Sequence, residues 1–224
     1  VIDGLVTGLG SLLAGRDVTV YDGTGRLGVD HAVTVDGPEG PVVIAADHVV
    51  LATGSTPRTI PGFEIDGSLV VTSDELLSIT EVPGRVAVIG GGAIGCEFAS
   101  MLADYGSAVT LLEAAAEILP GCDADVAKTV RRSFRRRRID VHSGVPVHSH
   151  DPVNGATTVR FGDDSTVEVD LVVVAVGRRP RGRHALATRV DHFLHSRPVC
   201  AVVDSQREAR LDQIQRHRRP HDPE

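Results

Sequence analysis

The sequence predicts an α/β protein built around a doubly wound parallel sheet. A glycine-rich loop, G-G-G-A-I-G at 90–95, directly follows a strand pattern and opens a helix pattern. Strand and helix patterns then alternate, which implies parallel strands joined by helical crossovers. An apolar fraction of 42% with only 3% aromatic residues and 24 glycines suits such a fold. At 224 residues, the chain is long enough for one or two domains.

The part of the chain before the glycine loop has the pattern of one helix followed by short strands. Leucines recur at helical spacing over 3–13, which predicts an amphipathic helix. The predicted strands are 18–21, 32–35, 42–45 and 48–52, with a turn at 22–25. The last of them ends at Thr53 and Gly54, as expected of a fully buried strand that stops at a ligand-facing loop. Residues 55–67 contain three breakers and are predicted to be a linker.

From residue 73 onwards, helices and strands alternate. A short helix over 73–77 is expected to be capped by Ser73. The elements predicted after it are strands at 85–89, 108–112 and 139–142, and helices at 93–105 and 123–137. Residues 145–169 have the pattern of a small antiparallel meander, and 171–176 that of another buried strand. The periodicity is lost beyond Arg178, where only 207–215 has a helix pattern, so an irregular tail is expected.

The glycine loop has the composition of a dinucleotide-binding turn. Gly90 permits the tight turn, Gly92 lets the backbone approach a pyrophosphate, and Gly95 allows helix and strand to pack closely. The helix that follows would point its first N–H groups and the positive end of its dipole at the phosphates. The predicted phosphate-binding residues are Gly90, Gly91, Gly92, Ala93, Ile94 and Gly95.

An acidic residue stands where such a site needs one. Glu113 ends the second strand, 18 residues after Gly95, where a carboxylate accepts hydrogen bonds from both ribose hydroxyls of an adenosine. Residues 114–116 are all alanine, so no arginine follows directly to neutralise a 2′-phosphate. The sequence therefore favours NAD over NADP. The alternative for Glu113 is a solvated carboxylate at a strand end.

Four motifs in fixed order resemble those of the flavoprotein disulfide reductases, also called pyridine nucleotide-disulfide oxidoreductases. They are L-A-T-G-S-T-P-R-T-I-P-G at 51–62, V-A-V-I-G-G-G-A-I-G-C-E-F at 86–98, V-T-L-L-E-A-A-A-E-I-L-P at 109–120 and V-A-V-G-R-R-P at 174–180. Within the family, the dihydrolipoamide dehydrogenases look most similar. Members of the family pass electrons from a dithiol through an enzyme disulfide and FAD to NAD.

The resemblance implies an α/β fold with a Rossmann-like doubly wound NAD-binding domain, plus a partial FAD-binding domain with a β-meander. The expected parts are the partial FAD-binding domain and linker at 1–67, the NAD(H)-binding domain at 68–180 and the tail at 181–224. The resemblance places Glu97 and Gly177 near the nicotinamide of NAD(H) and Val145 near its adenine. The residues expected to contact FAD are Thr24, Gly25, Thr53, Gly54 and Ser55.

The chain also departs from the family pattern. It has no C-x-x-x-x-C, and no second G-x-G-x-x-G that opens a helix pattern near its start, since the same spacing at 23–28 is followed by a strand pattern. No Gly-Asp flavin motif or catalytic His region follows Pro180. We therefore expect a fragment truncated at both ends, with no catalytic residue assigned and without the interface domain through which members form homodimers and join 2-oxo acid dehydrogenase complexes. The tail would be an out-of-frame product, a product of a truncated gene, or a basic interaction arm. Three functional hypotheses stay open: a dihydrolipoamide dehydrogenase, a relative such as mercuric reductase or a pyridine-nucleotide transhydrogenase, and an inactive NAD-binding module or gene remnant.

Composition argues against other classes of function. A net charge of −7 gives no reason to expect a nucleic-acid or membrane partner, and the absence of a long apolar run favours the cytoplasm. The arginines of 131–138 are interpreted as the wet face of a helix whose buried stripe is Val126, Val130 and Phe134. The spacing of Cys96, Cys122 and Cys200 suggests no structural disulfide, and Cys96 is expected to be a small buried residue. No metal site is predicted at His142, His148 and His150.

Overall fold

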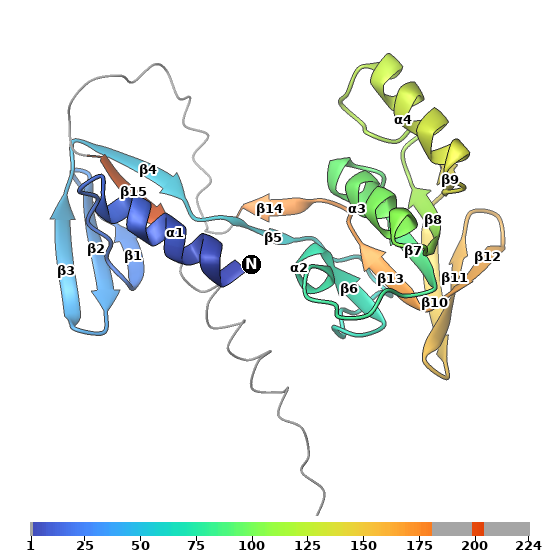
Figure 1. The fold of residues 1–224 in the computed structure, drawn as a ribbon, viewed down its shortest axis with the longest axis horizontal. Helices are drawn as coiled ribbons and strands as arrows, with labels where there is room; N and C mark the ends of the chain where they lie inside the picture. Colours follow the sequence, from blue (N-terminus) through green and yellow to red (C-terminus); the bar gives the residue numbers. More distant parts are fainter. Residues whose placement is uncertain (1, 181–198, 204–224) are drawn as a thin grey trace, which may run out of the picture. The chain divides into compact units, whose positions relative to one another are not determined.

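The structure is a computed structural model, which describes residues 2–180 and 199–203. The chain divides into two compact units at Gly54 and Ser55. The first contains the described residues 2–54 and 199–203, and the second contains 55–180 (Figure 1). The glycine loop and most of the sequence motifs therefore belong to the second unit.

The first unit has one helix and two small groups of strands in its described part. The elements are α1 (Ile2–Ala14), β1 (Thr24–Leu27), β2 (Ala32–Gly37), β3 (Gly40–Ala45), β4 (His48–Ala52) and β15 (Val199–Val203). Strands β1, β2 and β3 form an antiparallel sheet, whereas β4 pairs in parallel with β15. Two predictions are wrong here, because 18–21 is not a strand and the expected turn at 22–25 runs into β1. One segment of the tail predicted to be irregular is a strand, β15.

The expectation that β4 is fully buried is also wrong. Val50 and Leu51 are 49% and 44% exposed. A parallel strand is buried when helices cover both faces of its sheet. In the part of this unit that the structure describes, α1 is the only helix, and its own Leu5 is 70% exposed. The described elements therefore leave apolar surface of both α1 and β4 open.

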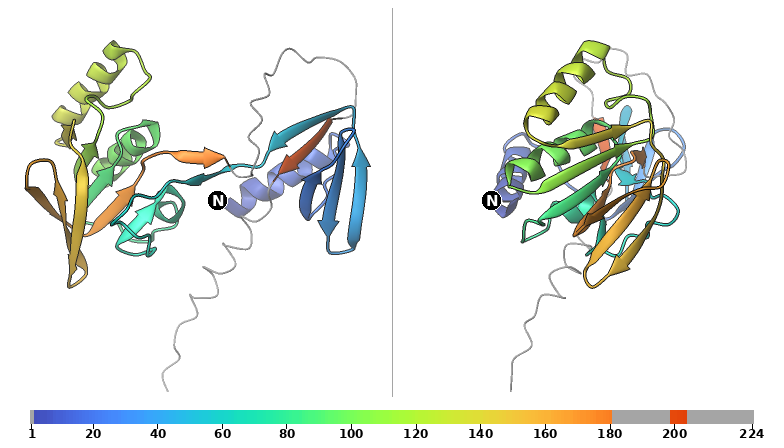
Figure 2. Two further views of the ribbon diagram at one scale, coloured as in Figure 1. Left: turned by 180° about the vertical axis from the view of Figure 1, so that it is seen from behind. Right: turned by 90° about the vertical axis from the view of Figure 1, so that its right-hand side faces the viewer.

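The second unit is a parallel sheet between two different layers. The strands are β6 (Val70–Thr72), β7 (Arg85–Ile89), β8 (Ala108–Glu113), β9 (Asp140–Ser143) and β13 (Leu171–Val174), in the order β6-β13-β7-β8-β9. Helices α3 (Ala93–Asp104) and α4 (Ala124–Arg136) lie on one face of this sheet (Figure 1). The antiparallel meander β10 (Val147–Val153), β11 (Ala156–Phe161) and β12 (Ser165–Val169) lies on the other (Figure 2). This is the predicted Rossmann-like arrangement.

Alternating strand residues supply two separate cores. On the helix side, Val88 and Leu111 pack in one cluster with Leu102 of α3 and Phe134 of α4. On the meander side, the intervening residues pack with Val159 and Phe161 of β11 and with Phe63. Two-sided burial explains why these strands are continuous apolar runs in the sequence.

The buried stripe of α4 differs from the predicted one. Val126 is 47% exposed, and Ala127 is buried together with Phe134. Ala127, Val130 and Phe134 are spaced by three and four residues, which follows the period of 3.6 residues per turn more closely than a strict spacing of four. The arginines of 131–138 do not all lie on the solvent-exposed face of α4, because the side chain of Arg131 is only 28% exposed.

Residues 55–67 are not a loose linker. Strand β5 (Ser55–Pro57) pairs antiparallel with β14 (Arg178–Pro180), and the side chain of Phe63 is fully buried. The short helix α2 (Ser73–Leu76) is capped by Thr72 instead of Ser73. Thr72 accepts a hydrogen bond from Asp74 N–H, and Glu75 accepts one from Thr72 N–H, which makes a capping box.

Candidate nucleotide-binding site

The predicted nucleotide-binding residues of the second unit gather at the carboxyl ends of parallel strands. The glycine loop follows β7, Glu113 ends β8, Val145 comes two residues after β9, and Gly177 comes three residues after β13. Open parallel sheets bind ligands outside these strand ends, at the point where the strand order reverses. Here the chain passes from β7 to β8 and β9 on one side, and β13 lies on the other. The topology thus brings together residues that are far apart in the sequence.

Close packing explains two of the loop glycines. Gly90 has a φ of +108°, and a Cβ placed on it would lie 2.5 Å from the carbonyl oxygen of Ala175. A Cβ on Gly95 would lie 1.8 Å from the carbonyl oxygen of Gly90. Neither position accepts a side chain, which confirms the tight turn and the close helix–strand packing expected from the sequence.

Gly92 is different, because the space beside it is open. It is the N-cap of α3 with ordinary extended backbone angles, and no atom lies within 4 Å of a Cβ built there. No side chain caps α3, so its first N–H groups, including those of Ala93 and Ile94, are not taken up by a capping residue. An open glycine beside an uncapped helix N-terminus fits an anionic pyrophosphate.

Glu113 is attached to the glycine loop. Its carboxylate accepts hydrogen bonds from Gly91 N–H at 2.5 Å and from Ala115 N–H at 2.6 Å. The carbonyl of Gly91 in turn accepts from Leu119 N–H at 2.7 Å, so residues 115–119 lie against the loop. Glu113 is therefore not merely a solvated carboxylate at a strand end. Its carboxylate lies beside the loop at the carboxyl end of β8, where a ribose is expected.

Cys96, in the first turn of α3, contacts the glycine loop. Its side chain is buried, as predicted, and its thiol donates to the carbonyl of Gly91 at 3.4 Å. Burial, with a smaller contribution from the nearby Glu113 charge, raises the pKa of Cys96 to about 11. The thiol is therefore protonated at neutral pH and serves as a packing group.

Sequence reasoning missed one cation at this edge of the sheet. Arg131 reaches from α4 to the end of β9, where its Nη2 donates to Ser143 Oγ at 2.6 Å. The same guanidinium pairs with Glu117, with Nε donating to Oε1 at 2.8 Å. The residues directly after Glu113 are alanines, and no sequence pattern links position 131 to position 143.

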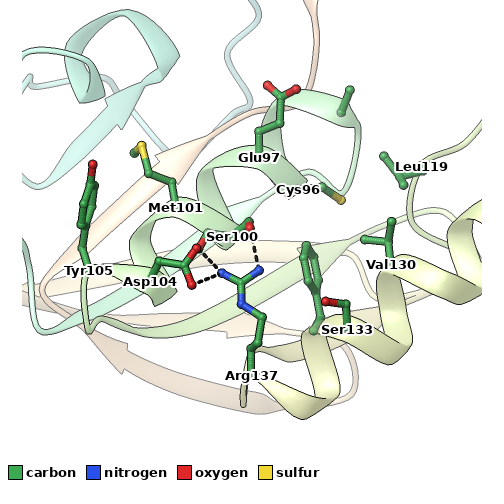
Figure 3. A pocket seen from close by; sticks show the side chains of 12 residues that line it. Cys96, Glu97, Ser100, Met101, Asp104, Tyr105, Leu119, Val130, Ser133 and Arg137 are labelled. Atoms are coloured by element: carbon green, nitrogen blue, oxygen red, sulfur yellow. Dashed lines mark hydrogen bonds and ion pairs between the residues drawn. The ribbon is translucent and has the colours of Figure 1, made fainter.

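Of the remaining residues expected near NAD(H), Glu97 and Gly177 are exposed, whereas Val145 is half-buried against the meander-side core. Val145 N–H donates to the carbonyl of Glu113 at 3.0 Å, and the exposed Gly177 has a φ of +109° and accepts from Arg58 N–H at 2.9 Å. Glu97 is exposed on α3, one turn after Ala93. Glu97 is one of the residues that line a groove of about 740 Å³ between α3 and α4. Figure 3 shows the side chains that line this groove. Of the predicted nucleotide-binding residues, only Ala93 and Glu97 line this groove. The groove is therefore distinct from the proposed site at the carboxyl ends of the strands.

The residues expected to contact FAD occupy two short stretches of the chain. Thr24 and Gly25 belong to β1, Thr53 and Gly54 follow β4, and Ser55 begins β5. Ser55 already has a structural partner, because its hydroxyl and carbonyl both accept from Arg178 at 2.7 Å. The involvement of these residues with a flavin stays a prediction.

Residues 2–180 and 199–203 contain no group of three or more His, Cys, Asp or Glu side chains placed to hold a metal ion. His142, His148 and His150 instead contact Asp140, the Gly162 carbonyl and Thr157, respectively. Within the same ranges, no helix has the length and hydropathy needed to span a bilayer.

Comparison with known proteins places these features in context. Residues 2–212 match the pyridine nucleotide-disulphide oxidoreductase family. This match runs past Pro180, where the motif resemblance was expected to end. A dihydrolipoyl dehydrogenase from Chlorobaculum tepidum is 38% identical over 175 residues, which is 76% of this chain and 37% of that protein.

Solved structures show the same likeness. The HOCl-induced flavoprotein disulfide reductase RclA from Escherichia coli superimposes with a TM-score of 0.67 and 31% identity, over 81% of this chain and 41% of that one. A water-forming NADH oxidase from Lactobacillus brevis, bound to NADH, gives a TM-score of 0.53 and 27% identity, over 67% of this chain and 35% of that one. The chain thus spans about two fifths of the length of the relatives that it matches.

Proposed function

Because the chain belongs to the pyridine nucleotide-disulphide oxidoreductase family, a family of oxidoreductases, we propose that its second unit binds NAD(H) at the strand ends. The observation that carries this proposal is the joined pair of Glu113 and the glycine loop. A carboxylate at the end of β8 beside an uncapped helix N-terminus offers acceptors for ribose hydroxyls and donors for a pyrophosphate in one place. Among the relatives, the oxidase from Lactobacillus brevis is described as bound to NADH.

The residues of the chain would divide the nucleotide between them. Glu113 would accept hydrogen bonds from the adenosine ribose, and Val145 would border the adenine. The open side of Gly92 would admit the pyrophosphate, which the N–H groups of Ala93 and Ile94 would meet. Glu97 and Gly177 would lie near the nicotinamide, which supplies the hydride chemistry when bound. The protein's own part is thus to bind and orient the cofactor.

For the protein to which this chain belongs, we propose a reaction of the dihydrolipoamide dehydrogenase type. Electrons would pass from a dithiol such as dihydrolipoamide through a disulfide and FAD to NAD. Support comes from the 38% identical dihydrolipoyl dehydrogenase. Thr24, Gly25, Thr53, Gly54 and Ser55 would contact FAD. Homodimers, assembly into 2-oxo acid dehydrogenase complexes and a cytoplasmic location belong to the same proposal.

The test combines flavin absorbance with turnover. We expect the whole protein to purify with bound FAD, seen as flavin absorbance, and to reduce NAD⁺ with dihydrolipoamide. Activity with mercuric ion, or hydride exchange between NADH and NADP⁺, in place of dihydrolipoamide turnover would identify a different member of the family. A whole protein that binds no flavin and oxidises no dithiol would contradict the proposal.

A second candidate function is NAD(H) binding without redox chemistry. It is favoured by the cysteines, because Cys96 is buried, Cys122 is exposed and free, and no two of the three are spaced as C-x-x-x-x-C. Disulfide exchange needs two cysteines within bonding reach of each other. In this case, the protein would bind NADH at the strand ends and show neither flavin absorbance nor dithiol oxidation.

A further inference from the structure

We propose that Arg131, held by Glu117, is a second determinant of whether the site accepts NAD(H) or NADP(H). The inference rests on the proposed nucleotide site and concerns its selectivity. The two cofactors differ only by a phosphate on the adenosine 2′-oxygen. A cation or an anion at that position therefore decides between them.

The sheet places Arg131 next to Glu113. Ser143 is the register partner of Glu113 across β8 and β9, and neighbouring strands lie about 4.8 Å apart. Both residues also point toward the helix side of the sheet, because side chains alternate and the residues two positions earlier, Leu111 and Val141, pack in the helix-side core. Arg131 Nη2 donates to Ser143 Oγ at 2.6 Å. The guanidinium thus stands one strand away from the carboxylate assigned to the ribose.

Glu117 keeps this guanidinium occupied. Its Oε1 accepts from Arg131 Nε at 2.8 Å, lies 2.6 Å from Nη2 and also accepts from Ile118 N–H at 3.0 Å. Hydrogen bonding to Arg131 lowers the pKa of Glu117, so this carboxyl is ionised at neutral pH. The Arg131 side chain is only 28% exposed, whereas that of Glu117 is 51% exposed. The charges of Arg131 and Glu117 therefore cancel each other beside the proposed nucleotide site.

This balance has a consequence for the 2′-position. A 2′-phosphate would meet two carboxylates, Glu113 and Glu117, and one cation that is already paired. The intervening residues 114–116 are alanines and add no charge. Removing the charge of Glu117 would leave Arg131 unpaired beside a single carboxylate, in a position to attract the phosphate.

The experiment measures dissociation constants of NAD⁺ and NADP⁺ for each variant of the 224-residue chain by isothermal titration at one salt concentration. We expect Glu117→Gln to lower the ratio of the NADP⁺ constant to the NAD⁺ constant about fivefold, as for one partly exposed charge pair. NAD⁺ affinity itself should change by less than about twofold. Adding Arg131→Gln to Glu117→Gln should reverse the gain. Arg132→Gln removes the same charge as Arg131→Gln, but at an exposed neighbouring position. It should leave the ratio of the NADP⁺ and NAD⁺ constants unchanged.

The outcomes separate the inference from the proposal beneath it. Wild-type protein that binds no NAD⁺ would overturn the proposed function. Wild-type protein that binds NAD⁺, with the same ratio in Glu117→Gln, would overturn the inference alone. Each ratio comes from one preparation, so it does not depend on the folded fraction of that preparation. Arg131→Gln alone should raise the ratio, because it leaves Glu113 and Glu117 without a cation. Arg131→Lys keeps the charge but not the forked contacts with Glu117 and Ser143, so its ratio should lie between those of the wild type and Arg131→Gln. A shift in Arg131→Lys as large as that in Arg131→Gln would contradict a role based on charge.

Discussion

The carboxylate of Glu113 accepts a hydrogen bond from the backbone N–H of Gly91, 22 residues earlier in the chain. This contact joins the end of β8 to the glycine loop before any nucleotide is bound. Leu119 N–H strengthens the connection by donating to the carbonyl of the same glycine. A site whose parts are already held in place loses less conformational entropy on binding. The adenosine half of the proposed site is therefore preorganised.

The two kinds of loop glycine should respond differently to a methyl group. Gly95→Ala forces a Cβ to within 1.8 Å of the Gly90 carbonyl oxygen, so we expect a loss of roughly 2–4 kcal/mol in the free energy of unfolding. Gly92→Ala meets open space and should cost less than about 1 kcal/mol, while weakening NADH binding about tenfold by crowding the pyrophosphate. Chemical denaturation and NADH titration measure the two effects. Equal stability losses in both variants would contradict the packing described for the loop.

Cys96 should be almost inert toward thiol reagents. Burial raises its pKa to about 11, so roughly one thousandth of it is thiolate at pH 8. The exposed Cys122 should be alkylated quickly by iodoacetamide under the same conditions. Mass mapping of the labelled peptides at pH 8 measures both rates, and denatured protein serves as the control in which the two become equal. Fast labelling of Cys96 in the folded protein would show that the glycine loop opens readily.

The second unit was largely predictable from the sequence, because its strands are covered on both faces. Two-sided burial makes each strand a continuous apolar run, and the helices between them have a clear amphipathic period. Strand 85–89 and the meander follow the prediction closely. The first unit was less predictable. An apolar strand such as β4 signals that something covers it, but its sequence does not say what.

Residues of the proposed site are predictable where local geometry dictates a residue type. Gly90 and Gly95 are required by close backbone contacts within the loop, and Glu113 was predicted from its place at a strand end. Arg131 was not predictable, because it reaches the site from α4 through contacts with Glu117 and Ser143. The cap of α2 shows the same limit at short range, since Thr72 and Ser73 are both good capping residues and only backbone geometry decides between them.

The ion pair at the start of the central strand should make stability depend on pH. Arg85 holds the pKa of Asp170 below its usual range by hydrogen bonding, while Asp170 also accepts from Arg85 N–H at 2.8 Å. A lowered folded pKa means that the stabilisation is present above the unfolded pKa of about 4 and is lost as the pH falls through the folded value. Asp170→Asn should therefore lower the Tm by a few degrees at pH 7 and by progressively less below about pH 4.

The control for this prediction is the exposed pair of Arg160 and Asp151, whose side chains are both 57% exposed. Asp151→Asn should change the Tm by less than about 1 °C, because exposed pairs contribute little. A difference between wild type and Asp170→Asn that stays constant from pH 7 to pH 3 would rule out the ionised form of Asp170 as its source.

Arg178 should hold the β5–β14 ribbon against α2. Its guanidinium donates to Ser55 Oγ, to Ser73 Oγ at 2.8 Å and to Asp74 Oδ1 at 2.9 Å. Arg178→Ala leaves these partly buried acceptors without their donor, and we expect a loss of roughly 1–3 kcal/mol in the free energy of unfolding. Hydrogen exchange should speed up in 55–58 and 178–180. Arg179→Ala, at the exposed neighbouring position, is the matched control, and an equal effect there would contradict a specific role for Arg178.

The central claim is that Glu113 and the glycine loop together form an NAD(H) site. The most direct test is isothermal titration of NADH into the wild-type chain and into Glu113→Gln, with Glu64→Gln, outside the proposed site, as the charge-matched control. We predict saturable binding at one site per chain, weakened about tenfold or more in Glu113→Gln and unchanged in Glu64→Gln. Absence of saturable binding by the wild type, or equal affinities in wild type and Glu113→Gln, would contradict the claim.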